Sequence, residues 1–129
     1  VEHAEIAISE ACKRTRSQIR EFSAAPFYMG ESHTGKHEWV LEFVKYPDEM
    51  DRFVSVLDEK LREINSDYDA KRYHDIILEK PILNVVKSGT FDSWLKENGK
   101  LGGQNKIPRL SNDRIILEQI LRMSELKMR

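Results

Sequence analysis

The chain has 129 residues and a mass of 15.1 kDa, which is enough for one ordinary domain and too little for a complete two-domain enzyme. Its 21 Lys and Arg against 22 Asp and Glu leave a net charge of −1. That balance argues against a dedicated nucleic-acid or anionic-membrane binder, because both classes depend on a basic excess or patch. With 40% hydrophobic residues, the chain can build a core without a disulfide or a metal.

Cys12 is the only cysteine, so an intramolecular disulfide is impossible and a reducing, cytoplasmic setting is expected. No apolar stretch approaches the roughly 18 residues of a membrane span, and the N-terminus lacks the order of a signal peptide. The sequence begins at Val1 and runs directly into a helical pattern. We therefore expect a piece cut from a longer soluble polypeptide.

The first elements are expected in the order helix, strand, strand. Residues 2–20 contain neither Gly nor Pro and carry small apolar side chains at helical spacing, which predicts a helix. Residues 22–29 favour a strand, which Pro26 limits to an edge or a broken position. Residues 30–35 indicate a hairpin or loop, and residues 37–46 predict a regular strand.

An amphipathic helix is expected next, opened by Pro47 and capped by Asp48. It should run to about Asn65, because apolar residues recur along one stripe: Met50, Phe53, Val54, Leu57, Leu61 and Ile64. Residues 67–75 predict a short helix.

The C-terminal part predicts one further strand and two helices. Pro81 restricts the strand to residues 82–86, and Thr90 is expected to cap a helix that ends near Asn98. After a glycine-containing loop, Ser111 or Asn112 should cap a last helix, which continues through Met123. This order predicts a single α+β domain with a small mixed sheet of about three to four strands and flanking helices.

Three groups of reactive residues favour ordinary structural roles. His33 and His37 are four residues apart, but Gly35 lies between them and a strand follows, so no metal site is expected; His3 and His74 are isolated. Cys12 is expected on the apolar side of the first helix, as a small hydrophobe rather than a nucleophile. The acid-rich stretches 48–51 and 58–63 interleave with basic residues and indicate a solvated helix face.

The segment 101–109 has a composition that could serve ligand binding. Its glycines allow close backbone approach, Lys106 supplies a mobile positive charge, and Arg109 adds a forked donor. On composition alone an ordinary surface loop is favoured, because one lysine and a few glycines do not make a phosphate-binding loop.

Two sequence blocks resemble a known family. Residues 85–92 read V-V-K-S-G-T-F-D, and residues 103–109 read G-Q-N-K-I-P-R after a short helix. Both resemble the C-terminal part of the auxin-responsive Gretchen Hagen family of acyl-acid amido synthetases, whose pattern is V-V-K-P-G-T-F-D followed by Q-Y-K-x-P-R. Residues 21–24 and 35–39 are similar to that family's first two C-terminal strands. Ser88 and Asn105 depart from the pattern, which indicates a divergent, bacterial member.

The resemblance implies the mobile C-terminal cap domain of an adenylate-forming ligase, inactive by itself. In such enzymes a large N-terminal domain of the same polypeptide holds ATP, Mg²⁺ and the acyl acid. The enzyme forms an acyl-AMP, and an amine or amino acid then takes the acyl group. The family's lysine falls on Lys106, the implied catalytic residue, while Gln104 and Arg109 are implied as weak nucleotide-binding or loop-shaping residues.

A free-standing α+β interaction or small-ligand regulatory module remains the alternative, because the same sheet and helices would be sufficient for it. Nucleic-acid binding through the sheet and through the basic residues 13–20 is disfavoured by the net charge of −1 and the 9% of aromatic residues. Neither nucleic acid nor a membrane is therefore expected as a partner.

Overall fold

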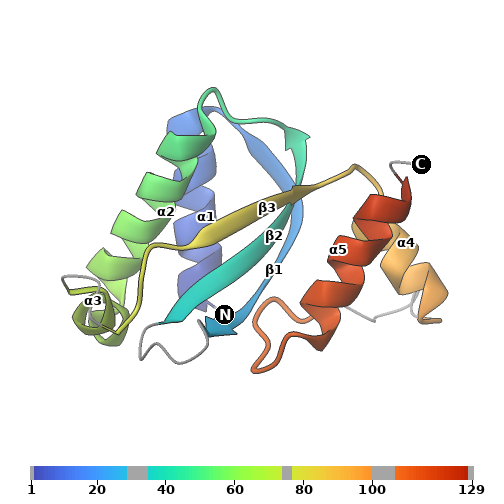
Figure 1. The fold of residues 1–129 in the computed structure, drawn as a ribbon. Coiled ribbons are helices and arrows are strands. Elements are labelled where there is room, and N and C mark those ends of the chain that lie inside the picture. The colour runs from blue at the N-terminus through green and yellow to red at the C-terminus, as the bar shows by residue number, and fades with distance from the viewer. Residues whose placement is uncertain (1, 29–34, 74–76, 100–106, 128–129) are drawn as a thin grey trace.

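The computed structural model describes residues 2–28, 35–73, 77–99 and 107–127. A three-stranded mixed sheet lies between two helical layers, so the α+β prediction is confirmed (Figure 1). The elements are α1 (Glu2–Thr15), β1 (Gln18–Tyr28), β2 (Gly35–Lys45), α2 (Met50–Ile64), α3 (Ser66–Arg72), β3 (Ile82–Val86), α4 (Thr90–Glu97) and α5 (Ile115–Lys127). In the described part of the chain, no helix is long and apolar enough to cross a membrane.

The strand order is β1-β2-β3, with β1 antiparallel and β3 parallel to the central β2. A parallel pair needs a crossover, and here the chain makes it through α2 and α3. Pro26 lies in β1, an outer strand of the sheet, where a missing backbone N–H is tolerated, so the edge-strand prediction for this segment is confirmed.

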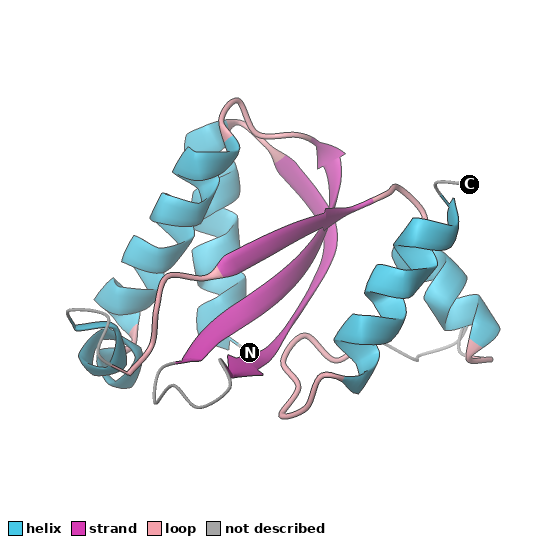
Figure 2. Ribbon diagram, viewed as in Figure 1, coloured by secondary structure: helices cyan, strands magenta, loops and turns pink. Residues whose placement is uncertain are grey.

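Helices cover both faces of the sheet (Figure 2), and each face has its own core. One core lies under α1 and α2 and includes the fully buried Ala7, Ala11, Leu41, Phe53 and Leu57. The other lies under α4 and α5 and includes Val40, Val86, Phe91, Leu117 and Ile120. Alternate residues of β2 therefore serve opposite cores, which explains the continuous apolar run of Trp39, Val40 and Leu41.

The first helix is five residues shorter than the sequence pattern predicts. Arg16 adopts a left-handed backbone with φ 56°, and the Ser17 N–H donates to the Cys12 carbonyl at 2.9 Å, which ends the helix. β1 then begins at Gln18. The prediction of helix through residue 20 was wrong because Ile19 pairs with Phe43 of β2, and this long-range pairing overrides the local helical pattern.

Two of the predicted helix caps are also corrected. Asp48 is not the cap of α2; its N–H donates to the Thr15 carbonyl at 3.1 Å, and Glu49 occupies the cap position without a side-chain bond. Thr90 is already the first residue of α4, and Gly89 stands in the cap position.

The last helix begins at Ile115, later than expected. Asp113 accepts the Ile115 N–H through its side-chain oxygen at 3.0 Å, whereas Ser111 and Asn112 make no side-chain bond to the helix among the described contacts. The Ser111 N–H donates instead to the Ala24 carbonyl at 3.0 Å, which ties the approach of α5 to β1.

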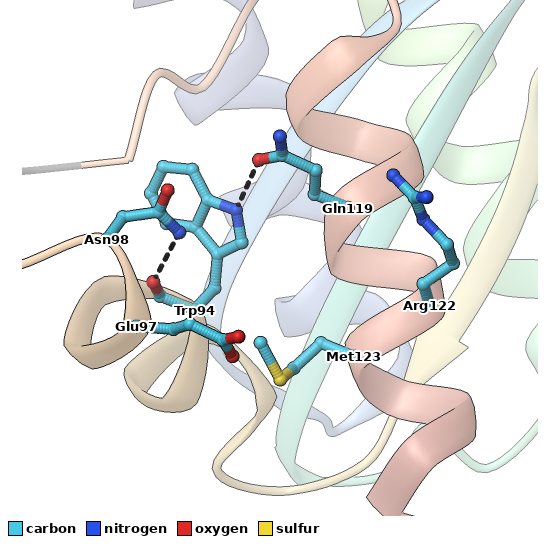
Figure 3. A pocket seen from close by; sticks show the side chains of 6 residues that line it. All are labelled: Trp94, Glu97, Asn98, Gln119, Arg122 and Met123. Atoms are coloured by element: carbon cyan, nitrogen blue, oxygen red, sulfur yellow. Dashed lines mark hydrogen bonds between the residues drawn. The ribbon is translucent and has the colours of Figure 1, made fainter.

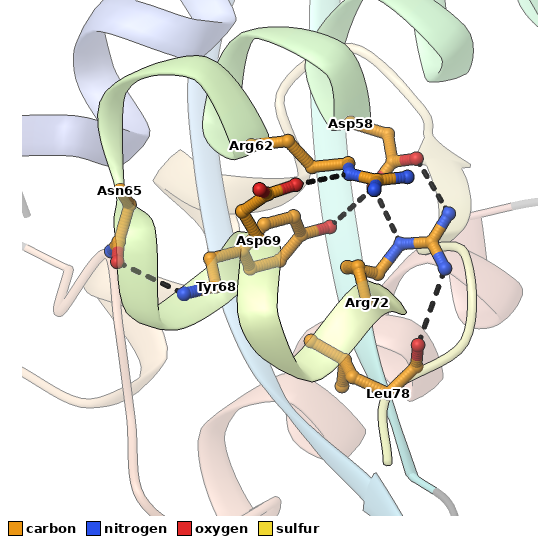
Figure 4. A network of polar contacts seen from close by, with 7 residues as sticks. All are labelled: Asp58, Arg62, Asn65, Tyr68, Asp69, Arg72 and Leu78. Atoms are coloured by element: carbon orange, nitrogen blue, oxygen red, sulfur yellow. Dashed lines mark hydrogen bonds and ion pairs between the residues drawn. The ribbon is translucent and has the colours of Figure 1, made fainter. Parts of the chain in front are cut away.

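A buried polar network joins α2 to α3 (Figure 4). Asp58 accepts two bonds from the Arg72 guanidinium, at 2.8 and 2.7 Å, and one from the Tyr68 hydroxyl at 2.7 Å. Arg72 also donates to the Leu78 carbonyl at 3.2 Å. Asp58 is only 5% exposed, so the prediction of a solvated face at residues 58–63 was wrong for this residue. No sequence periodicity separates a buried, paired aspartate from its exposed neighbours.

Candidate functional site

The first sequence block forms the turn between β3 and α4. Gly89 has φ 87°, a left-handed conformation that favours glycine, and this reverses the chain after Lys87. The Thr90 hydroxyl donates to the Lys87 carbonyl at 2.6 Å, and the Lys87 N–H donates to the Ser124 hydroxyl at 3.1 Å. The S-G-T sequence therefore makes a closed turn that is tied to α5.

A buried carboxylate holds the start of α4 against the sheet. Glu42 of β2 is fully buried, and its Oε1 accepts the Phe91 N–H at 3.0 Å. Its Oε2 lies 3.3 Å from the Arg20 Nε of β1, and Arg20 also pairs with Asp92, the last residue of the block. One arginine thus links the central strand and the helix start.

The described residues of the second block are attached to β1, the strand that carries Arg20. The Ser23 hydroxyl donates to the Pro108 carbonyl at 2.7 Å, and the Ala24 N–H donates to the Arg109 carbonyl at 2.9 Å. Arg109 pairs with Glu21 at 3.1 Å and with Glu5 of α1 at 2.8 Å. Residues 108–109 are therefore held along the outer edge of β1.

Arg109 is surrounded by groups that hold its positive charge. Its guanidinium carbon lies 4.9 Å from the centre of the Phe22 ring. Burial alone would lower the pKa of Arg109, but the carboxylates of Glu21 and Glu5 outweigh burial and raise the pKa. Two of its donors are already bound to protein carboxylates. This suits a structural role for Arg109, in which it holds residues 108–109 on β1.

Both blocks therefore meet at two consecutive residues of β1. Arg20 pairs with Asp92 of the first block, and Glu21 pairs with Arg109 of the second. This convergence was not visible in the sequence, because residues 20 and 21 were expected at the end of a helix and the start of a strand. The implied catalytic Lys106 and the weak candidate Gln104 lie outside the described residues, so their roles stay predictions.

A pocket of about 350 Å³ lies between α4 and α5 (Figure 3). Trp94 forms part of its wall and donates its indole N–H to the Gln119 side-chain oxygen at 2.9 Å. Glu97 and Arg122 bring opposite charges to the rim, and Met123 adds an apolar contact. The sequence gives no local signal for this pocket, because its lining residues are far apart along the chain; Trp94 and Gln119, for example, are 25 positions apart.

A second pocket, of about 370 Å³, lies at the edge of β1 and is lined by Ala24, Ala25, Pro26, His37, Trp39, Leu110, Ser111 and Asn112. It adjoins the attachment of residues 108–109, because Leu110 bridges to Ala24. Burial lowers the pKa of His37, and the nearby charge of Lys71 lowers it further, so the imidazole is neutral at pH 7.

Other predicted reactive residues have ordinary surroundings. Cys12 is half-buried beside the core under α1. Burial raises the pKa of its thiol, which agrees with a small apolar side chain and not with a nucleophile. His33 lies outside the described residues, so its pairing with His37 is not described. Across the described ranges, no three His, Cys, Asp or Glu side chains gather where they could hold a metal ion.

This chain is similar to one known protein family and to solved structures of acyl acid amido synthetases. The model of the GH3 family C-terminal domain matches residues 2–115. Among curated protein sequences none matches this chain. Of the solved structures, the GH3.15 acyl acid amido synthetase is similar with a TM-score of 0.70 and 19% identity, over 97% of this chain and 23% of that chain. The AtGH3.15 acyl acid amido synthetase in complex with 2,4-DB is similar with a TM-score of 0.70 and 18% identity, over 94% and 23%.

The chain thus spans less than a quarter of the length of these two solved structures, and at such identities they show the fold. The family model carries the assignment, because it covers most of the chain, including the first block and the described part of the second. The resemblance read from residues 85–92 and 103–109 is confirmed. This chain belongs to the GH3 family, as its C-terminal domain.

Proposed function

We propose that this chain is the mobile C-terminal cap of an ATP-dependent acyl-acid amido synthetase, and that it is inactive by itself. The longer enzyme would activate a carboxylic acid as an acyl-AMP with loss of pyrophosphate, then pass the acyl group to an amine or amino acid. Membership of the GH3 family supports this proposal, as does the likeness to structures named acyl acid amido synthetases.

The observation that carries the proposal is the convergence of both blocks on β1. Arg20 pairs with Asp92 and Glu21 pairs with Arg109, so described residues that precede and follow Lys106 in the sequence are both attached to β1. A reactive lysine on such a tethered segment can be delivered to and withdrawn from an active site as the whole domain moves.

Lys106 is the proposed catalytic residue. During adenylation the attacking carboxylate and the α-phosphate bring negative charges together, and a positioned ammonium group stabilises that arrangement electrostatically. Arg109 would act by holding residues 108–109 on β1, since Glu5 and Glu21 already occupy two of its donors. Gln104 is a weaker candidate for contact with the nucleotide. ATP and Mg²⁺ would be held mainly by the large N-terminal domain, the proposed partner.

The test uses the longer enzyme with Lys106→Ala and measures acid-dependent release of pyrophosphate from ATP. We expect a loss of about 100-fold or more, which corresponds to the several kcal/mol that such a charge supplies. Lys96→Ala, a change at an exposed residue of α4, is the matched control and should keep full activity. Unchanged pyrophosphate release in Lys106→Ala would reject the catalytic role.

We also propose that the reaction takes place in the cytoplasm. The single, half-buried free thiol of Cys12 is compatible with a reducing compartment. Fractionation of the source cells, with detection of the longer enzyme, tests this assignment directly.

A further inference from the structure

Ile107 is the described residue that directly follows Lys106 in the sequence. It is only 5% exposed and lies in the core under α4 and α5, which also includes Val40 and Phe91. Consecutive Cα atoms are about 3.8 Å apart, so the position of Ile107 limits that of Lys106 by covalent geometry alone. The proposed catalytic lysine is therefore joined directly to a residue of the core.

The next residue, Pro108, is held by one buried side chain of β1. The Ser23 hydroxyl donates to the Pro108 carbonyl at 2.7 Å, and Ser23 is 1% exposed. Proline has no N–H, so this carbonyl is the only backbone polar group through which Pro108 can be bonded. The proline ring also fixes its own φ and favours an extended backbone at Ile107. The step from Ile107 to Pro108 is therefore stiff, and Ser23 attaches its end to the sheet.

Ser23 and Ile107 belong to the same face of the sheet. Ser23 pairs with Val40 of β2, and Val40 is part of the core that contains Ile107. Directly opposed residues of an antiparallel pair point to the same face. At the strand edge, the Ala24 N–H donates to the Arg109 carbonyl at 2.9 Å. Residues 107–109, called the anchor below, are thus held by a core contact, a buried hydroxyl and a backbone bond.

The nearest described residue on the other side of Lys106 is much more distant along the chain. It is Gly99, which follows α4 and lies seven positions before Lys106. Seven residues can span up to about 24 Å, whereas one residue spans about 3.8 Å. Covalent geometry therefore restricts the backbone of Lys106 far more tightly from the anchor than from α4.

We propose that Ser23 and Ile107 are positioning residues for Lys106. Both side chains are buried, so they act through the backbone of the anchor and not by contact with a substrate. The inference rests on the proposed catalytic role of Lys106. A misplacement of about 1 Å can lower a reaction rate by about 100-fold. A looser anchor should therefore slow adenylation without weakening the binding of ATP or the acid, since the large N-terminal domain would hold both.

The test is a double-mutant cycle in the longer enzyme, measured as acid-dependent release of pyrophosphate from ATP. Ser23→Ala removes the hydroxyl, and Ile107→Val shortens the core side chain by one carbon. We expect Ser23→Ala to lower kcat about five- to tenfold and Ile107→Val about threefold, with KM for ATP and for the acid unchanged. Each change combined with Lys106→Ala should give the kcat of Lys106→Ala alone, because no ammonium group remains to be positioned.

Tyr68→Phe and Ile120→Val are the matched controls. The first removes a buried hydroxyl that donates to Asp58 at 2.7 Å, and the second shortens a fully buried isoleucine of the core that contains Ile107. Both should lower the unfolding temperature about as much as the test variants do. At an assay temperature below the unfolding of every variant, both should keep the kcat of the parent enzyme.

Three results would overturn the inference: full kcat in Ser23→Ala and Ile107→Val, an equal loss of kcat with and without Lys106, or an equal loss in the matched controls. The last two would assign the anchor to the stability of the whole domain. If Lys106→Ala alone keeps full activity, the proposed catalytic role fails and this inference fails with it. A loss in Lys106→Ala without a loss in Ser23→Ala or Ile107→Val rejects the positioning role alone.

Discussion

The side chain of Glu42 accepts the backbone N–H of Phe91 at 3.0 Å, across 49 positions of the sequence. The carboxylate is fully buried in the central strand, and the N–H belongs to the first turn of α4. Helix N-termini have unpaired N–H groups that favour a negative partner. Glu42 therefore accepts an N–H group at the start of α4, as a local cap residue would, and it also attaches the helix to the sheet.

Replacement of Glu42 should destabilise the domain. Glu42→Ala leaves the Phe91 N–H buried without an acceptor and removes a partner of Arg20, so we expect a loss of about 2–3 kcal/mol in the free energy of unfolding. Glu42→Gln keeps a carbonyl acceptor and should lose about half as much. Urea unfolding followed by circular dichroism measures both. Glu97→Ala, at an exposed site, is the control, and an equal loss there would contradict the assigned role.

The Asp58–Arg72 pair should make stability depend on acid pH. Burial works to raise the pKa of Asp58, but hydrogen bonds from Arg72 and Tyr68 outweigh it, so the pKa lies below its usual range. A carboxyl group whose pKa is lowered by folding stabilises the protein above its unfolded pKa of about 3.9, and that stability is lost as the pH falls through the folded value.

Asp58→Asn tests this dependence. At pH 7 we expect a loss of about 3 kcal/mol, because Arg72 is left buried without its charged partner. The difference between the two proteins should stay constant from pH 7 to about 4 and shrink below that. Unfolding in urea at a series of pH values gives the difference directly, with the contributions of other carboxylates cancelling. A difference that grows toward acid pH would refute the assignment.

Gly89 should be the least replaceable residue of its turn. With φ 87° its backbone lies where a side chain is strained, and Gly89→Ala should lose about 1–2 kcal/mol of stability. Gly89→Asn is the matched control and should lose less, since asparagine tolerates left-handed backbone better. Thermal unfolding of the two variants is the measurement. Equal stability of the alanine variant and the parent would show that the turn can change its backbone conformation.

Arg109 should stabilise the attachment of its own segment to the edge of β1. Arg109→Ala removes the pairs with Glu5 and Glu21 and the contact with Phe22, while the bond from the Ala24 N–H to the Arg109 carbonyl remains possible. Since Arg109 is partly exposed, we expect the free energy of local opening to fall by only about 1 kcal/mol. This loss would be measured as about fivefold faster hydrogen exchange at the Ala24 N–H.

Two variants serve as controls for Arg109. Arg109→Lys keeps the charge but loses the forked donor and should lie between the parent and Arg109→Ala. Arg122→Ala, at an exposed residue of α5, should leave exchange at Ala24 unchanged. If exchange at Ala24 is equally slow in Arg109→Ala and the parent, the ion pairs do not hold this edge.

Much of the fold could be predicted because its signals are local. The apolar stripe from Met50 to Ile64 belongs to α2 as expected, and β3 covers residues 82–86 as Pro81 indicated. Periodicity predicts such elements because one face of each must be buried whatever it packs against. The family was also readable, since residues 85–92 and 103–109 stand in order at a suitable separation.

Features that depend on partners distant in sequence were decided only by the tertiary structure. Residues 18–20 became strand because β2 lies beside them, and Asp58 became buried because Arg72 meets it there. The pairing of Asp92 with Arg20 and of Arg109 with the neighbouring Glu21, and the Trp39 indole N–H that has no partner among the described residues, follow from the same cause. A sequence specifies which face of an element is apolar, but the partner of each polar group depends on which elements the packed fold brings together.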